Sequence, residues 1–407
     1  MEMKKYKLGD IAKTSSGGTP KSTIAEYYEG GNIPWINSGE LGNPFITSTN
    51  NFITKKGYDN SSAKLFPPQT VLLAMYGATA GKVSLLEIEA CTNQAICAIM
   101  PNKDILLPIY LKYKLDTMYN YLVRLSTGSA RDNLSQDGIK AIELSIPSLS
   151  VQQKIATVLS TLDKRIENLR AQNRVLEQTA KTIYDYTFLQ CAGHQTTYNK
   201  TLNRNIPANW EVKKLGDCLA SISTGLNPRQ NFTLGNGSIK YITVKNLTLD
   251  GSIDYSSCDF IDENARAKVH KRSNIKVGDI LFASISPLGR CYLIQEKPED
   301  WDINESVFSI SPADFSTSYY LYSFLRSKEF VAKAEQRATG SIFLGIRVDT
   351  LKKMEVLWPD SKTMGKFNAQ VEPIFKKQLV NTKQIETLTT QRNTLLPLLM
   401  TGQVEVV

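Results

Sequence analysis

Apolar residues recur at alternating spacings of four and three positions in two long stretches of this chain. The first stretch, residues 155–183, contains no glycine or proline, whereas the second, residues 367–395, contains Pro373 near its start. This is the heptad pattern of paired helices, so we expect two long helices, with a kink or a first turn at the proline. The expected seam is formed by Ile155, Leu159, Leu162, Ile166, Leu169, Asn173, Leu176 and Ile183 in the first helix and by Phe367, Val371, Ile374, Gln378, Ile385, Leu388 and Leu395 in the second.

Polar residues inside the two seams indicate how the helices pair. An antiparallel register sets Asn173 opposite Gln378, where the two amides can bond to each other. A parallel register would set both amides against isoleucines, at a cost of about 1–3 kcal/mol for each unpaired group. We therefore expect an antiparallel coiled coil, although this register leaves Leu169 opposite Asn381. The alternative is that each helix packs only on its own globular domain.

Outside these helices the apolar runs are short and lie between turn-forming residues, which favours strands. Together with one helix in each globular part, the runs predict two mixed α/β (α+β) domains. The expected strands are residues 71–75, 95–100, 280–283 and 307–310, and the expected helices are residues 107–125 and 318–337.

The two globular parts repeat each other in sequence. Residues 142–147 return as residues 354–359, each time just before a predicted long helix. A repeat of this length is a duplicated domain rather than a solenoid unit. We therefore expect a pseudo-two-fold molecule with two similar working surfaces and a two-part target. The other matched blocks, in the same order in both halves, are 7–10 with 214–217, 33–36 with 239–242, 70–74 with 279–283, 93–101 with 304–312 and 127–129 with 339–341.

The net charge of the chain favours one class of binding partner. The 407 residues carry a net charge of +9 and a pI near 9.0, which favours polyanions such as nucleic acid. No signal peptide and no apolar stretch of about 18 residues is visible, so a cytoplasmic protein without a membrane span is expected.

The sequence offers no catalytic or metal-binding signature. The six cysteines form no C-x-x-C pair and there are only two histidines, so no metal site is expected. Residues 43–45 and 66–68 match the Asn-Pro-Pro-aromatic motif of adenine methyltransferases only in part. The glycines of residues 77–82 are too closely spaced for a phosphate-binding P-loop. We expect neither a catalytic residue nor a cofactor site in this chain.

Several motifs in a fixed order resemble one known family. The chain is similar, over essentially all of its 407 residues, to the specificity (S) subunit of type I restriction–modification systems. The motifs are Leu8-Gly9-Asp10-Ile11, Ser16-Gly17-Gly18-Thr19-Pro20, Ile33-Pro34-Trp35-Ile36, residues 76–83, Asn93-Gln94-Ala95, Ile146-Pro147 before Gln152-Gln153-Lys154-Ile155-Ala156, and residues 395–404. The second half departs from this pattern with Tyr241 in place of Trp35 and with Thr224-Gly225-Leu226-Asn227-Pro228 in place of Gly-Gly-Thr-Pro.

The resemblance implies a domain plan and a set of partners. Two target recognition domains would each read one half of a bipartite sequence in double-stranded DNA, and the helices would separate them and dock two modification (methyltransferase) subunits. Restriction subunits would join the complex, and S-adenosylmethionine would be bound by the modification subunit. The implied boundaries are 1–149 for the first recognition domain, 150–192 for the central helix, 193–360 for the second recognition domain, 361–396 for the C-terminal helix, and 397–407 for a tail that returns toward the N-terminus.

Loop residues with suitable donors and acceptors are the candidates for DNA contact, because fixed hydrogen-bonding groups read base edges. In the matched halves Lys82 corresponds to Arg290 and Arg131 to Phe343, which predicts two different half-sites. The candidates are Asn37, Ser38, Thr79, Lys82, Ser129, Arg131 and Asn133 in the first domain and Thr243, Lys245, Asn246, Ser286, Arg290, Ser341 and Arg347 in the second.

Two other classes of protein fit the same sequence. One is a stand-alone DNA-binding relative that joins no enzyme, and the other is a coiled-coil scaffold without a nucleic-acid role. Co-purification with a methyltransferase subunit distinguishes the first class, and a test of DNA binding by the assembled complex distinguishes the second.

Overall fold

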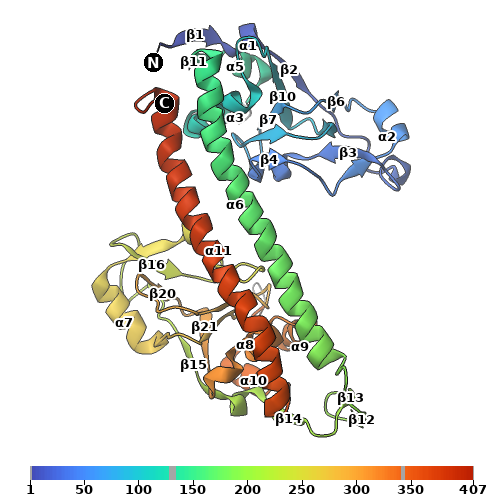
Figure 1. Ribbon diagram of the computed structural model, residues 1–407, viewed down its shortest axis with the longest axis vertical. Helices are drawn as coiled ribbons and strands as arrows, with labels where there is room; N and C mark the ends of the chain where they lie inside the picture. The colour runs from blue at the N-terminus through green and yellow to red at the C-terminus, as the bar shows by residue number, and fades with distance from the viewer. Residues whose placement is uncertain (1, 128–133, 341–343, 407) are drawn as a thin grey trace. The chain divides into compact units, whose positions relative to one another are not determined.

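The computed structural model describes residues 2–127, 134–340 and 344–406, and the chain forms two compact units (Figure 1). The first unit combines Met1–Asn168 with Gln384–Val407, and the second is Leu169–Lys383. Each unit holds one globular domain and a part of each long helix. The division between the two units falls inside both long helices, whereas the boundaries expected from the sequence lie at the ends of the helices.

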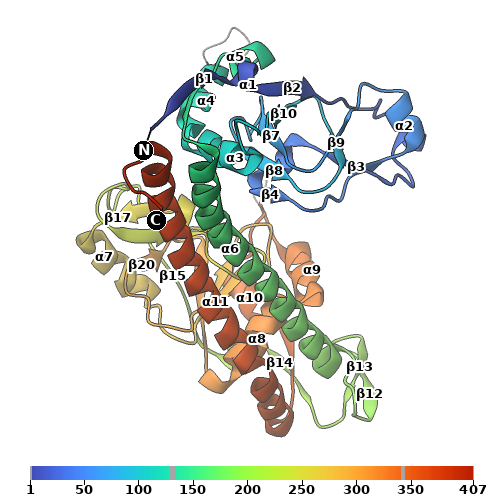
Figure 2. The same cartoon turned by 45° about the horizontal axis from the view of Figure 1, so that its top comes forward.

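The globular domain of the first unit contains two sheets with apolar side chains between them. Strand β7 (Thr70–Ala74) is buried along its whole length. Val71 and Leu73 face helix α3 (Pro108–Thr117), whereas Leu72 and Ala74 face the second sheet, because successive side chains of a strand point to opposite faces. Helix α3 lies beside β7 (Figure 2). The first sheet has the order β2 (Ala12–Ser16), β10 (Ile96–Pro101), β7, β8 (Val83–Leu86), β4 (Phe45–Ile46), and the second has the order β5 (Phe52–Ile53), β3 (Ile33–Ile36), β9 (Ala90–Thr92), β6 (Leu65–Phe66). Strand β1 (Lys4–Lys7) pairs with β11 (Glu143–Ile146).

The globular domain of the second unit repeats this plan. In β18 (Ile280–Ala283), Ile280 and Phe282 belong to the cluster that holds helix α8 (Ser318–Leu325), and Leu281 and Ala283 face the other way. The order β2-β10-β7-β8 of the first unit recurs as β15 (Leu219–Thr224), β21 (Val307–Pro312), β18, β19 (Cys291–Leu293), which confirms the predicted duplication. The other strands are β17 (Asp259–Ile261), β16 (Ile239–Ile242) and β20 (Trp301–Ile303) in one sheet and the pairs β14 (Glu211–Lys214) with β22 (Glu355–Trp358) and β12 (Thr196–Asn199) with β13 (Arg204–Pro207).

The single helix predicted in each globular part is broken in two. In the first domain α3 is followed by α4 (Tyr119–Thr127) after Met118. In the second domain α8 is followed by α9 (Lys328–Arg337), because the Ser327 hydroxyl accepts the N–H of Phe330 (3.2 Å) and caps a new helix. The remaining short helices are α1 (Leu8–Ile11), α2 (Lys55–Asp59), α5 (Gln136–Lys140), α7 (Glu263–Ser273) and α10 (Val348–Lys352).

The two predicted long helices are α6 (Leu149–Tyr184) and α11 (Ser361–Thr401), which lie side by side (Figure 1). Their order of contact reverses along the chain, since Asp163 meets Arg392 in the first unit and Tyr184 meets Phe367 in the second. The predicted antiparallel direction is confirmed, and every predicted seam residue is buried or half-buried. Of the two roles expected for Pro373, a place in the first turn is excluded, because this residue lies inside α11. One predicted detail differs, since α11 continues to Thr401 instead of ending at residue 396.

A polar layer crosses the helix pair within the second unit. The Asn381 side chain is fully buried, and its Nδ2 donates to Oδ1 of Asn173 (2.9 Å). Gln378 Nε2 donates to the main-chain carbonyl of Asn173 (3.2 Å) rather than to its side chain. The predicted neighbourhood of Asn173 and Gln378 is therefore present, but the amide partner of Asn173 is Asn381, which the expected register set opposite Leu169. Gln378 and Asn381 are three residues apart and therefore lie on the same face of α11, one turn from each other. Both side chains can reach Asn173 from that face.

Buried charges attach each globular domain to its own stretch of helix. In the first unit Lys112 of α3 is 1% exposed and lies between Asp116 (2.9 Å) and Asp163 of α6 (3.7 Å). The Tyr113 hydroxyl also donates to Asp163 (2.7 Å). In the second unit the corresponding contact joins Arg326, just after α8, to Glu177 of α6 (2.6 Å). Removing one partner of such a buried pair is costly, so these contacts fix where the domains attach.

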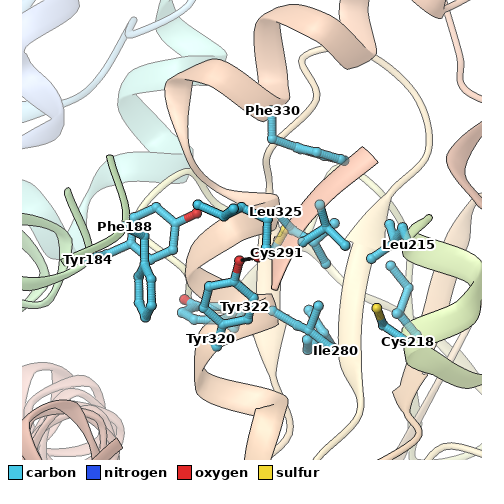
Figure 3. Packing of buried hydrophobic residues seen from close by; sticks show 14 of the residues in the cluster. Tyr184, Phe188, Leu215, Cys218, Ile280, Cys291, Tyr320, Tyr322, Leu325 and Phe330 are labelled. Carbon is cyan, nitrogen blue, oxygen red and sulfur yellow. Dashed lines mark hydrogen bonds between the residues drawn. The ribbon is translucent and has the colours of Figure 1, made fainter. Parts of the chain in front are cut away.

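An aromatic cluster forms the centre of the second unit's core (Figure 3). Phe188 follows α6 in a π-helical turn, Asp185–Leu189, and is 1% exposed. Its ring centroid lies 4.7 Å from that of Tyr320 in α8 and 4.9 Å from that of Phe367 in α11. The cluster thus joins the end of one long helix, the start of the other and the globular domain.

Replacing Phe188 with alanine should destabilise the protein strongly, because the change removes a buried ring and leaves a cavity. We expect a loss of about 3–5 kcal/mol in the free energy of unfolding. Urea unfolding measures it, with Tyr186→Ala as the matched control. Tyr186 belongs to the same turn but is 60% exposed, so its loss should change the stability by about 0.5 kcal/mol or less. Equal effects of the two substitutions would contradict this packing.

Candidate nucleic-acid interface

Three main-chain hydrogen bonds gather the candidate loops of the first domain at one edge of its sheets. The N–H of Asn93 donates to the carbonyl of Ile36 (2.9 Å), and the N–H of Met75 donates to Ala95 (2.8 Å). The N–H of Leu134 donates to Met75 (3.0 Å). The ends of β3 and β7 and the start of β10 therefore meet, and the loops that follow them lie together.

The second domain has the same three bonds at the corresponding positions. The N–H of Asn304 donates to Ile242 (2.8 Å), that of Ser284 to Ser306 (3.1 Å), and that of Ile346 to Ser284 (2.9 Å). The duplicated sequence therefore builds two equivalent edges. Each edge can present a different set of side chains on one backbone plan.

Glycines allow a further loop to join each edge. A Cβ atom on Gly17 would lie 2.0 Å from the carbonyl oxygen of Thr92 at the end of β9. A Cβ atom on Gly225 would lie 1.7 Å from the carbonyl oxygen of Ile303 at the end of β20. Only glycine permits so close an approach, which explains the glycines in the two matched turn motifs.

In the first domain the structure brings the predicted residues together. The Thr79 hydroxyl donates to the carbonyl of Ser38 (2.8 Å), which ties the loop after β7 to the loop after β3. Asn37 caps the 3-10 turn Ser38–Gly42, and its Oδ1 accepts the N–H of Gly39 (2.9 Å). Lys82 is exposed, and its ammonium lies 4.6 Å from the ring centroid of Tyr119 in α4. Ser129, Arg131 and Asn133 lie outside the described residues.

In the second domain the predicted residues divide into exposed groups and internal supports. Lys245 is exposed and pairs loosely with Asp259 (3.5 Å), and Ser286 and Arg347 are also exposed. Asn246 is fully buried, and its Oδ1 accepts the N–H and the hydroxyl of Thr243 (2.9 Å each). The Asn246 amide is therefore not available at the surface. It stabilises the loop that follows β16 through these hydrogen bonds instead. Ser341 lies outside the described residues.

Lys82 and Arg290 correspond in the repeat but are used differently. The Arg290 guanidinium donates to the carbonyls of Val244 (2.6 Å), Pro287 (3.0 Å) and Ile285 (3.3 Å). Burial lowers the pKa of Arg290, and the three carbonyls engage each of its three nitrogens. Arg290 thus joins two loops of the second edge, whereas the Lys82 ammonium remains at the surface of the first.

Two further pairs of residues at these edges were not among the predicted contacts. In the first domain the Thr19 hydroxyl donates to Oε1 of Gln94, which is exposed. In the second domain Nδ2 of Asn227 donates to Oε1 of Glu305 (2.6 Å). The matched blocks that begin at residues 93 and 304 contain the signal for this equivalence, since Gln94 and Glu305 follow corresponding asparagines.

Two further findings concern metal binding and membrane crossing. Within the described residues, no group of three or more His, Cys, Asp or Glu side chains is placed to hold a metal ion. Among the helices that the structure describes, none has the length and apolar character needed to cross a membrane.

Replacing Arg290 with alanine should lower stability, because three main-chain carbonyls lose a charged donor. We expect a loss of about 1.5–3 kcal/mol in the free energy of unfolding. Lys82→Ala is the matched control and should change it by about 0.5 kcal/mol or less. Chemical denaturation measures both, and an Arg290→Ala variant as stable as the Lys82→Ala variant would contradict the internal role of Arg290.

The comparisons with known proteins agree with this architecture. The family model for the "Type I restriction modification DNA specificity domain" matches residues 1–178 and again residues 207–392. The MjaIX specificity subunit of Methanocaldococcus jannaschii, a type I restriction enzyme subunit, is 32% identical over 98% of this chain and 93% of its own length. The HindI specificity subunit of Haemophilus influenzae is 21% identical over 99% of this chain and 100% of its own length.

A solved structure shares the fold. The crystal structure of a type I restriction–modification S subunit from M. genitalium matches with a TM-score of 0.61 at 17% sequence identity, over 98% of this chain and 96% of that one. The family model covers both halves of the repeat in the same order as the two globular domains. The chain therefore belongs to the family of type I restriction–modification specificity subunits.

Proposed function

We propose that this chain reads a bipartite, asymmetric sequence in double-stranded DNA, one half with each globular domain. The observation that carries the proposal is the pair of equivalent edges, which share three main-chain hydrogen bonds and differ in side chains. A duplicated scaffold with unlike side chains suits a target with two unlike halves. The net charge of +9 supports a polyanionic partner.

The exposed side chains at the edges have the chemistry that the two parts of DNA recognition require. Lysines such as Lys82 and Lys245 contact phosphates and fix the position of the protein on the duplex, whereas uncharged polar groups read base edges. Asn246 and Arg290 contribute indirectly, because they hold the loops in shape. Rigid loops lower the entropy cost of binding.

The proposal gives this chain a non-catalytic role in a larger complex in the cytoplasm. Family membership supports docking of two modification (methyltransferase) subunits and of restriction subunits, with S-adenosylmethionine bound by the modification subunit rather than by this chain. Along α6 and α11 the polar residues away from the seam are largely exposed, which leaves surface for such partners.

The proposal is tested by expressing the chain together with the modification subunits of its own system in a host free of methylation. Mapping methylated adenines across the host genome should reveal one bipartite sequence whose two halves differ. A complex that methylates no defined sequence would contradict the proposal. Identical half-sites would contradict the assignment of different side chains to different sequences.

Replacing Lys82 with alanine should weaken DNA binding by this complex without changing its fold. The loss of one phosphate contact should reduce the slope of log affinity against log salt concentration by about 0.9. Lys103→Ala is the matched control, because Lys103 is exposed beyond the opposite end of β10. Titrations at several salt concentrations measure both slopes, and equal slopes for the two variants would remove Lys82 from the interface.

A further inference from the structure

The pairs Thr19–Gln94 and Asn227–Glu305 occupy equivalent places at the two edges. Gln94 and Glu305 each follow an asparagine whose N–H bonds to the end of the neighbouring strand, β3 in one domain and β16 in the other. Each is held by a polar residue from the glycine-containing loop that approaches the same edge. The two positions therefore share their backbone setting and differ in chemistry.

The carboxamide and the carboxylate offer different groups to a partner. Oε1 of Gln94 accepts from Thr19 and keeps a second lone pair, Nε2 retains hydrogen-bond donors, and the side chain is exposed. A carboxylate at the same position offers only acceptors. Glutamine suits adenine, which presents both a donor and an acceptor in the major groove, whereas glutamate suits the amino group on N4 of cytosine.

In the second pair two acceptor oxygens have no donor. Oε2 of Glu305 and Oδ1 of Asn227 are both buried and have no hydrogen-bond partner among the described residues. Acceptors that are buried without a donor cost free energy in the unbound protein, because buried polar groups are normally paired. The Glu305 side chain as a whole is half-buried, and an amino group from a ligand that reaches it would satisfy Oε2.

We propose that Gln94 and Glu305 are equivalent specificity-determining residues, with Gln94 reading an adenine in one half-site and Glu305 accepting the amino group of a cytosine in the other. This inference rests on the proposed function and adds the chemistry that makes the half-sites differ. Thr19 and Asn227 are positioning residues, because each orients the reading side chain through a hydrogen bond.

The test compares Glu305→Gln and Gln94→Glu in the complex with its modification subunits. Both substitutions preserve side-chain shape, exchange donors and acceptors, and change the charge by one unit. Each complex selects DNA from a library of duplexes in which both half-sites are randomised. Glu305→Gln should change or relax the preference at one base pair of one half-site, with about a 10- to 100-fold loss of preference for cytosine. Gln94→Glu should act at one base pair of the other half-site only.

Glu335→Gln is the matched control, because Glu335 is an exposed residue of α9 in the same domain and its substitution removes the same charge. It should leave the selected sequence unchanged in both halves. A Glu305→Gln complex that selects the wild-type sequence at every position would overturn the inference while leaving the proposed function intact. Should Glu305→Gln fail to fold, the exposed Gln94→Glu variant decides in the same way, since an unchanged first-domain preference would also overturn it. A wild-type complex that selects no sequence would overturn the proposed function and this inference with it.

Discussion

The pairing of α6 with α11 is the constraint on which the rest of this structure depends. One helix lies between the two globular domains in the sequence and the other follows both, so their contact closes the chain on itself within each unit. The apolar seam makes the pairing stable, but apolar groups alone do not fix direction or register. The buried amide of Asn381 and the half-buried amide of Asn173 add that information, because sliding or reversing the helices would leave them unpaired.

Each globular domain attaches to this helix pair through a contact between opposite charges, but the charged residues differ between the two domains. The position of Asp116 in the first domain corresponds to that of Arg326 in the second, so the sign of the charge is reversed. In the first unit Lys112 supplies the cation that meets Asp163, whereas in the second Arg326 itself meets Glu177. Each domain therefore fits its own stretch of helix, and a domain placed on the other stretch would bury unpaired charges.

The two edges show the same division between a retained scaffold and altered side chains. The main-chain bonds and the close glycine approaches at Gly17 and Gly225 are common to both domains. The side chains on this scaffold have diverged, as Lys82 and Arg290 show: the Lys82 ammonium stays at the surface, whereas the half-buried Arg290 guanidinium binds main-chain carbonyls of the protein itself. A protein that must recognise two unlike sequences can keep its backbone geometry constant and vary only the groups that reach the target.

The sequence by itself determined the two heptad helices, their antiparallel direction, the duplication and the loops at which the two edges form, because these follow from periodicity and order along the chain. It also indicated the family, through the order of several motifs. Only the tertiary structure decided which amide pairs with Asn173, where the helices in each globular domain break, and that Asn246 and Arg290 face inward. It also revealed the equivalence of the Gln94 and Glu305 settings. The physical reason is that a polar side chain takes its role from the partners that folding brings to it, and those partners come from distant segments whose distances no local pattern records.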